Sequence, residues 1–221
     1  MPANEFLPEP LPAEPMALFS AWFSHAAHVR SQPNPDAMVL ATVDTAGRPA
    51  ARVVLCKRLV ADAGYVVFFT NYHSRKAREL GEQPRGAGVL HWDALHRQAR
   101  IEGPVVRSPA TESDAYFAQR PLDSRIGAWA SQQSEPLASR AQLAEQVRAT
   151  SARFGVAQDA TDAAIPRPPH WGGYRLWIDT IELWVEGPGR IHDRALWHRD
   201  LSRSDEYSFS GSHWRSTRLN P

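Results

Sequence analysis

The sequence is poor in cysteine and has no long hydrophobic run. Cys56 is the only cysteine among 221 residues, so the chain cannot form an internal disulfide and suits a reducing compartment. No apolar stretch approaches the ~18 residues that a membrane-spanning helix needs, and the acidic, proline-rich N-terminus has no features of a signal peptide. We therefore expect a cytoplasmic protein without a membrane partner.

An excess of charge of either sign is also missing. The chain has 25 Lys and Arg residues against 24 Asp and Glu residues, which argues against broad binding to nucleic acid. The sequence contains no glycine-rich dinucleotide fingerprint, Walker A motif, His-Glu-x-x-His pair or Gly-x-Ser-x-Gly nucleophile elbow. Its nine histidines show no metal-ligand spacing, so we expect no metal site. A phosphorylated ligand would have to be held by side chains and strand ends.

Apolar segments joined by short links are the dominant pattern. Links this short are typical of antiparallel hairpins. Five such strands with one inserted helix predict a small antiparallel barrel, in a mainly β, α+β fold. The predicted strands are 37–43, 51–57, 65–70, 86–92 and 98–107, the inserted helix is 74–83 with Ser74 as its cap, and further strands are predicted at 174–184, 190–199 and 213–219.

The chain length fits one domain with an attached arm. Residues 1–14 contain four prolines and no hydrophobic period, so we expect a flexible arm ahead of a single domain that spans 15–221. Pro15 is well placed to open a helix.

A helical insertion is predicted at about 108–155. Thr111 and Asp114 have the spacing of a capping box at its start, and Pro121 ends the first helix. The following segment, 123–131, is expected to be irregular, and 139–154 to form an amphipathic helix.

Basic residues gather between positions 52 and 76. Arg52 and Lys57 lie at the ends of one apolar strand, and Arg75 and Lys76 follow Ser74 at the expected helix start. Four cations, a hydroxyl and a helix N-terminus can together hold a phosphate. Two core strands with solvated charged ends are an equally good explanation of this stretch alone. Cys56, inside the strand, is expected to be a buried residue rather than a nucleophile.

Two further groups of polar residues are candidates for a site. Tyr116 and Arg120 are one helical turn apart and Ser124 follows the Pro121 break, a combination that suits a phosphate monoester. An exposed helix end is the alternative.

The second group follows Trp184 and a tight turn. In an alternating strand, Arg190, His192 and Arg194 would share one face, where an anionic partner would offset the cost of burying them. A solvated strand face is the alternative here.

Six spaced segments together resemble the pyridoxamine 5'-phosphate oxidase family, from about Ala37 to Pro221. They are RVVLCK (52–57), FFTNYHSRKA (68–77), YFAQRPLDSRIGAWASQQS (116–134), WGGYR (171–175), LWVEGPGRIHDR (183–194) and RLNP (218–221). The resemblance implies an FMN-binding split β-barrel that forms a homodimer, with FMN bound at the subunit interface.

The resemblance also implies the roles of individual residues. FMN would contact Arg52, Val53, Val54, Leu55, Cys56, Lys57, Phe69, Thr70, Arg75, Lys76 and Gln98, with Gln133, Ser134, Trp184 and Arg194 contributed by the other subunit. The substrate phosphate would be bound by Lys57, Tyr116, Arg120 and Ser124. Arg190 and His192 would lie over the substrate ring as the catalytic pair.

The activity implied is oxidation of pyridoxine or pyridoxamine 5'-phosphate to pyridoxal 5'-phosphate, with O2 reduced to H2O2. Three departures from the family pattern stand out. Phe69 replaces a common Tyr, the N-terminal arm lacks the Arg-x-x-Tyr segment that closes over the substrate in some relatives, and RLNP replaces the commoner RLAP ending.

Two rival functions remain open on the sequence. One is a paralogous flavin oxidase that acts on a dihydrophenazine, although such enzymes match less faithfully at the positions expected to bind the vitamin phosphate. The other is a non-catalytic split-barrel protein that binds flavin or pyridoxal phosphate. The presence of both Arg190 and His192 argues against this second alternative.

Overall fold

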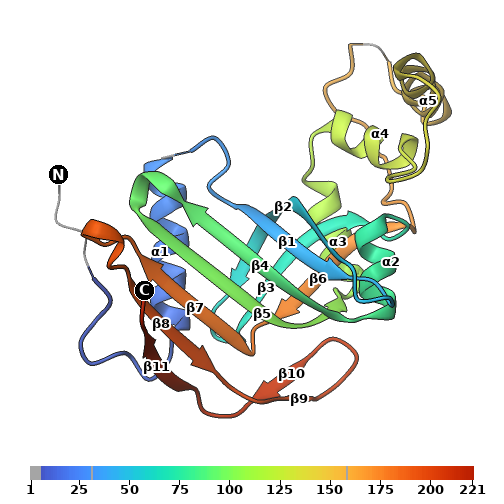
Figure 1. Cartoon of the computed structure of the whole chain (residues 1–221). Coiled ribbons are helices and arrows are strands. Elements are labelled where there is room, and N and C mark those ends of the chain that lie inside the picture. Colours follow the sequence, from blue (N-terminus) through green and yellow to red (C-terminus); the bar gives the residue numbers. More distant parts are fainter. Residues whose placement is uncertain (1–5, 31, 158) are drawn as a thin grey trace.

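Six antiparallel strands close into a barrel at the centre of the molecule (Figure 1). The computed structural model describes residues 6–30, 32–157 and 159–221. The barrel strands are β1 (Ala37–Val43), β2 (Pro49–Val60), β3 (Tyr65–Asn71), β4 (Arg85–Trp92), β5 (Arg97–Arg107) and β6 (Trp171–Trp177). Their order is β5-β4-β1-β2-β3-β6, and β6 pairs with β5 to complete the ring. The predicted antiparallel barrel is confirmed, but it has six strands rather than five. The predicted strand 174–184 is broken in two, and its first part, β6, is the sixth barrel strand.

Strand β5 belongs both to the barrel and to a C-terminal sheet. Residues 97–102 pair with β7 (Thr180–Val185), whereas residues 105–107 pair with β6. Gly103 lies at this fork, where an added Cβ would be 1.8 Å from the Trp177 carbonyl oxygen. The close approach of two backbones therefore requires glycine at this position.

The C-terminal sheet continues from β7 through two more strands. These are β8 (Asp193–His198) and β11 (Arg215–Leu219), and β9 (Leu201–Arg203) with β10 (Phe209–Gly211) forms a small separate hairpin. Helix α1 (Met16–Val29) buries Phe19 and Trp22 against the core. This confirms the helix expected after Pro15.

The described part of the N-terminal arm is packed on the C-terminal sheet. Leu7 is 4% exposed, and its backbone N–H donates to Asp193 Oδ2 at 2.8 Å. Trp197 Nε1 donates to the Pro12 carbonyl oxygen at 2.9 Å. The expectation of a flexible arm is therefore wrong for residues 6–14, because apolar burial and hydrogen bonds hold this segment. Residues 1–5 lie outside the described part of the chain.

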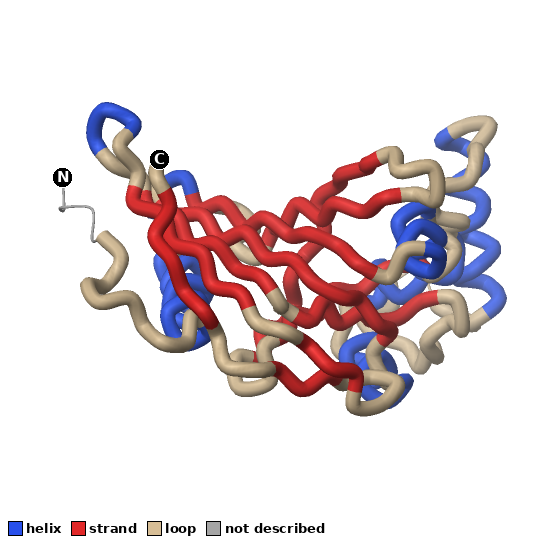
Figure 2. Tube along the Cα trace, turned by 60° about the horizontal axis from the view of Figure 1, so that its bottom comes forward, coloured by secondary structure: helices blue, strands red, loops and turns tan. Residues whose placement is uncertain are grey.

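The remaining helices lie at the other end of the molecule from the two termini (Figures 1 and 2). They are α2 (Arg75–Glu82), α3 (Ala110–Ala118), α4 (Leu122–Ala130) and α5 (Arg140–Arg153). Segment 123–131 is thus mostly a regular helix rather than irregular. Pro121 occupies the N-cap position of α4, where its missing N–H takes no hydrogen bond from the helix. No described helix is long and apolar enough to cross a membrane.

Two predicted caps form differently. Helix α3 begins after Pro109, so Thr111 is already inside the helix and makes no capping box. Ser74 does occupy the N-cap of α2, but its side chain makes no cap hydrogen bond. Its hydroxyl accepts a hydrogen bond from Lys76 Nζ at 3.3 Å instead.

The predicted strand 190–199 begins later than expected. Arg190 ends a short 3-10 turn, Pro188–Arg190, and β8 starts only at Asp193. Gly189 and Arg190 both have left-handed backbone angles, with φ of 63° and 66°. The side-chain alternation of a strand does not apply there, so the shared strand face expected for Arg190, His192 and Arg194 is wrong.

Candidate active site

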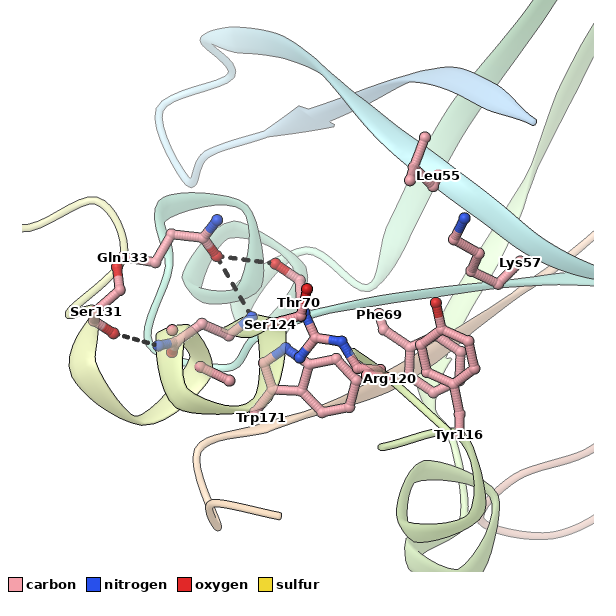
Figure 3. A pocket seen from close by; sticks show the side chains of 13 residues that line it. Leu55, Lys57, Phe69, Thr70, Tyr116, Arg120, Ser124, Ser131, Gln133 and Trp171 are labelled. Atoms are coloured by element: carbon pink, nitrogen blue, oxygen red, sulfur yellow. Dashed lines mark hydrogen bonds between the residues drawn. The ribbon is translucent and has the colours of Figure 1, made fainter. Parts of the chain in front are cut away.

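A cavity of about 390 Å³ lies where β2, β3, α3 and α4 meet (Figure 3). It contains all four residues expected to bind the substrate phosphate. The lining residues are Leu55, Lys57, Phe69, Thr70, Asn71, Tyr116, Arg120, Ser124, Gly127, Ala128, Ser131, Gln133 and Trp171. The Pro121 break places Ser124 in the first turn of α4, close to Arg120 in the turn that follows α3. We call this the first cavity.

Arg120 is the most unusual charged group in the first cavity. Its guanidinium carbon lies 4.6 Å from the centre of the Trp171 ring, and its Nη1 is buried without a hydrogen-bond partner among the described residues. Burial lowers the pKa of Arg120. A buried cationic nitrogen that lacks a partner is costly unless a ligand supplies one. The site therefore suits an anion.

The Tyr116 ring lies nearly parallel to the Trp171 ring, with 6.2 Å between the ring centroids, and Figure 3 shows Lys57 on the Tyr116 side of the cavity. Lys57 Nζ makes an ion pair with Asp36 at 2.7 Å. The Tyr116 ring stacks on Phe69 with 4.0 Å between ring centroids. Stacking on Phe69 restricts the orientation of the tyrosine ring. A phenol hydroxyl, an ammonium and a guanidinium are thus held around one space.

A second cavity of about 490 Å³ adjoins the first and shares Phe69, Thr70 and Gln133 with it. It contains most of the residues expected to bind FMN. The lining residues are Ala50, Ala51, Arg52, Val53, Val54, Phe69, Thr70, Arg75, Lys76, Gln133 and Ser134. Three cations, Arg52, Arg75 and Lys76, face this space, which is an arrangement suited to a phosphate.

Lys76 is buried in the wall of the second cavity. Its Nζ donates to Thr70 Oγ1 at 3.1 Å and to Ser74 Oγ at 3.3 Å. Burial, with a smaller contribution from the charge of Arg52, lowers the pKa of Lys76 to about 8. The ammonium group is thus poorly solvated and lies near another cation, a setting in which a bound anion would stabilise its charged form.

Cys56 faces away from both cavities. The side chain is 1% exposed and belongs to the barrel core. Burial raises the pKa of the thiol to about 12, so it is not a nucleophile at neutral pH. The backbone N–H of Cys56 is also occupied, since it donates to the Asp36 carbonyl oxygen at 2.8 Å. Leu55, its neighbour, does line the first cavity.

Gln133 and Ser134 line the cavity of their own chain, although we expected them to come from the other subunit. Gln133 Oε1 accepts from Thr70 Oγ1 at 3.1 Å and from the Asn71 backbone N–H at 3.4 Å. The chain after α4 folds back over the end of β3, a path that depends on tertiary packing and has no local sequence signal. The intrachain contacts correct the assignment of these two residues.

The other expected site residues form a separate group on the C-terminal sheet. Gln98, Trp184 and Arg194 are direct partners in a row across β5, β7 and β8. The His192 ring lies 4.7 Å from the Trp184 ring. Arg194 Nε donates to Glu182 Oε1 at 2.8 Å, which fixes the guanidinium on the sheet.

The loop before β8 holds His192 in one tautomer. The Gly187 backbone N–H donates to His192 Nδ1 at 3.2 Å, so the neutral ring carries its proton on Nε2 and can donate from there. An added Cβ at Gly187 would lie 1.8 Å from the Ile191 carbonyl oxygen, so the loop is too tight for a side chain at that position. Arg190 lies at the exposed tip of the loop.

Within one chain, the residues expected to form the site therefore lie in two separate groups. None of Gln98, Trp184, Arg190, His192 and Arg194 lines either of the two cavities. The first cavity also includes residues that sequence reasoning gave no role. These are Asn71, Gly127, Ala128, Ser131 and Trp171. All five lie inside the segments that carried the family resemblance, and all but Ser131 have no charge or hydroxyl that points to a phosphate.

Comparison with known proteins identifies the family. Residues 25–154 match the family described as pyridoxamine 5'-phosphate oxidase, and residues 171–221 match the pyridoxine 5'-phosphate oxidase C-terminal dimerisation region. The pyridoxine/pyridoxamine 5'-phosphate oxidase of Burkholderia thailandensis is 50% identical over 207 residues, which cover 94% of this chain and 89% of that protein. The enzyme of the same name from Paraburkholderia phytofirmans is 49% identical with the same coverage.

Two solved structures share the fold. PhzG from Burkholderia lata, in complex with tetrahydrophenazine-1-carboxylic acid, has a TM-score of 0.80 and 32% identity, covering 95% of this chain and 94% of that one. A pyridoxamine 5'-phosphate oxidase-related, FMN-binding protein from Nostoc punctiforme has a TM-score of 0.66 and 20% identity, covering 92% and 97%. The barrel and these matches define a split-barrel oxidase. The chain belongs to the pyridoxamine 5'-phosphate oxidase family.

Proposed function

We propose that this protein is an FMN-dependent oxidase that converts pyridoxine and pyridoxamine 5'-phosphates to pyridoxal 5'-phosphate, with O2 reduced to H2O2. The observation that carries the proposal is the pair of adjoining cavities, each lined by cations. Two phosphate-binding regions side by side suit two phosphorylated molecules in contact. The unpartnered Nη1 of Arg120 indicates that the first cavity binds the substrate phosphate.

The second cavity fits FMN. Arg52, Arg75 and Lys76 supply positive charge for a phosphate, and the lowered pKa of Lys76 reflects its burial and the nearby charge of Arg52. Thr70 and Gln133 supply hydrogen-bonding groups on the wall shared with the first cavity. When bound there, FMN would supply the two-electron oxidation and pass the electrons to O2.

The first cavity orients the substrate. Lys57 and Arg120 neutralise its phosphate, with Tyr116 and Ser124 as hydrogen-bonding partners. Phe69 and Thr70 line both cavities, so a substrate in the first cavity lies against a cofactor in the second. Fixed contact between two reactants removes much of the entropic cost of bringing them together.

Arg190 and His192 complete the site from a second subunit in this proposal. His192 can donate a hydrogen bond from Nε2, and Arg190 adds positive charge, so both stabilise negative charge that develops on the substrate ring. A homodimer has independent support. Val39 and Val53 are direct partners on the outer face of β1 and β2 and are 42% and 64% exposed. Such an apolar sheet face suits a subunit interface, and residues 171–221 match a dimerisation region.

The experiment is a paired assay on purified protein supplied with FMN. Pyridoxine 5'-phosphate should give pyridoxal 5'-phosphate and an equal amount of H2O2. A protein that binds FMN but leaves both phosphorylated vitamers unchanged would exclude this activity. Oxidation of a reduced phenazine carboxylic acid in the same assay would then favour the alternative raised by PhzG. No turnover of either substrate class would favour a non-catalytic binding protein.

A further inference from the structure

Glu79 is a buried acid at the centre of the cationic wall of the second cavity. It lies on α2 and is 4% exposed. Its Oε2 accepts from Thr42 Oγ1 at 2.5 Å and from Arg52 Nη2 at 3.1 Å, while its Oε1 accepts from Arg75 Nε at 2.7 Å. Burial alone would raise the pKa of Glu79, but these hydrogen bonds hold it below its usual value. The carboxylate is ionised at neutral pH.

Glu79 does not itself face the cavity. Arg52 and Arg75 line that space, whereas Glu79 and Thr42 are not among the lining residues. The carboxylate therefore lies behind the two arginines and joins side chains from β2 and α2. Thr42, on β1, also accepts a hydrogen bond from Arg52 Nη1. The three elements that carry the wall are linked through one carboxylate.

We propose that Glu79 is a positioning residue that holds Arg52 and Arg75 in place for the cofactor phosphate. The inference rests on the proposed function, because it takes the second cavity as the FMN site. Arg75 shows why the contact matters. Its side chain is 59% exposed, and its Nε donates to Glu79 Oε1. Without that bond the long side chain would sample many rotamers in solvent.

Two effects of Glu79 on phosphate binding oppose each other. The negative charge of the carboxylate reduces the attraction of the wall for an anion, whereas the fixed positions of the arginines reduce the entropic cost of binding. The charge effect is already reduced, because three donors, two of them cationic, hydrogen-bond to the carboxylate and the arginines lie between it and the cavity. Immobilising one long side chain costs about 0.5–1.5 kcal/mol. Positioning of two arginines is therefore expected to be the larger effect.

The test measures binding of FMN and of riboflavin, which lacks the phosphate, to apo-protein. Glu79→Ala should weaken FMN binding about tenfold while riboflavin binding changes little, because two arginines must then be ordered by the ligand. Glu79→Gln keeps one acceptor oxygen and should lose less than Glu79→Ala. Glu82→Ala is the matched control, since Glu82 lies on the same helix and is exposed; it should leave both affinities unchanged.

A double-mutant cycle identifies the route of the effect. If Glu79 acts through Arg75, then Glu79→Ala should cost much less FMN affinity in an Arg75→Ala background than in the wild-type protein. Equal weakening of FMN and riboflavin would mean that Glu79 supports only the fold, and tighter FMN binding would mean that its charge dominates. Either result overturns the proposal. Should Glu79→Ala not fold, Glu79→Gln carries the same comparison.

The outcome also separates this inference from the proposed function. Wild-type protein that binds FMN no better than riboflavin would contradict the FMN site itself, and the role of Glu79 with it. Wild-type protein that prefers FMN, with an unchanged preference in both Glu79 variants, would contradict only the role of Glu79.

Discussion

The Arg120 guanidinium lies 4.6 Å from the centre of the Trp171 ring, and one of its nitrogens is buried without a partner. The ring fixes the cation on one side and leaves its polar edge for a ligand. This contact joins the turn after α3 to Trp171, the first residue of β6. It places the Arg120 guanidinium, which can bind a phosphate, where the barrel meets the helices.

Arg120→Ala should reduce kcat/KM for pyridoxine 5'-phosphate at least about 30-fold, because loss of a buried charged partner costs about 2–5 kcal/mol. FMN retention should not change, since Arg120 does not line the second cavity. Steady-state kinetics and flavin absorbance of the purified variant measure the two quantities. Arg153→Ala is a matched control, because Arg153 also stacks on a tryptophan, Trp129, at 4.7 Å. Loss of flavin from Arg120→Ala would place this residue in the cofactor site instead.

FMN affinity should fall as pH rises through the pKa of Lys76. In the free protein this pKa is about 8, and a bound phosphate would raise it by stabilising the charged form. Binding above pH 8 then requires uptake of a proton, so the Kd should increase about tenfold between pH 7 and pH 9. Fluorescence titration measures this dependence. In Lys76→Met the affinity should be weaker and nearly constant over the same pH range; an unchanged slope would assign the titration to another group.

Leu7→Ala should lower the free energy of unfolding by about 2–3 kcal/mol, the usual cost of truncating a buried leucine. Leu7 is 4% exposed and belongs to the core cluster. Phe6→Ala, at a neighbouring side chain that is 57% exposed, should change stability by less than about 0.5 kcal/mol. Denaturant unfolding of both variants provides the comparison. Equal, small effects would mean that the arm is free in solution.

Gly103→Ala should destabilise the protein by more than about 4 kcal/mol or prevent folding. The added methyl group would lie 1.8 Å from the Trp177 carbonyl oxygen, at the fork where β5 leaves one strand partner for another. Gly81→Ala is the control, because nothing lies within 4 Å of a Cβ at that helical position. Thermal unfolding, followed by flavin fluorescence, compares the stability of the two variants. A stable Gly103→Ala protein would mean that the backbones at Gly103 and Trp177 can move apart.

The barrel could be predicted from the sequence because its signals are local. Short links between apolar segments specify antiparallel pairing, and 37–43 was predicted with the bounds that β1 has in the structure. The extra turn before β8 was missed for a physical reason. Arg190 adopts a left-handed backbone angle, which is uncommon for a residue that is not glycine. The sequence does not predict the start of α4, because Pro121 indicates a helix break and its place at the N-cap is visible only in the structure.

The site could be predicted only in part. The cations between positions 52 and 76 indicate an anion site by their charge alone. The structure brings Arg52, Arg75 and Lys76 to one cavity. Gln133 was placed on the wrong subunit, because the sequence does not specify how the chain after α4 returns to Thr70. The role of Glu79 was missed for a similar reason. Its partners Thr42 and Arg52 are 37 and 27 residues away in the chain.

The central claim is that one catalytic site combines the cavities of one subunit with Arg190 and His192 of the other. Mixing two inactive variants tests it most directly. Arg120→Ala damages only the first cavity and Arg190→Ala only the loop, so a mixed dimer would contain one intact site and one doubly altered site. After random exchange of subunits, activity should return to about a quarter of the wild-type value. Mixed dimers that form but remain inactive would show that both groups of residues act within a single chain and would contradict the account.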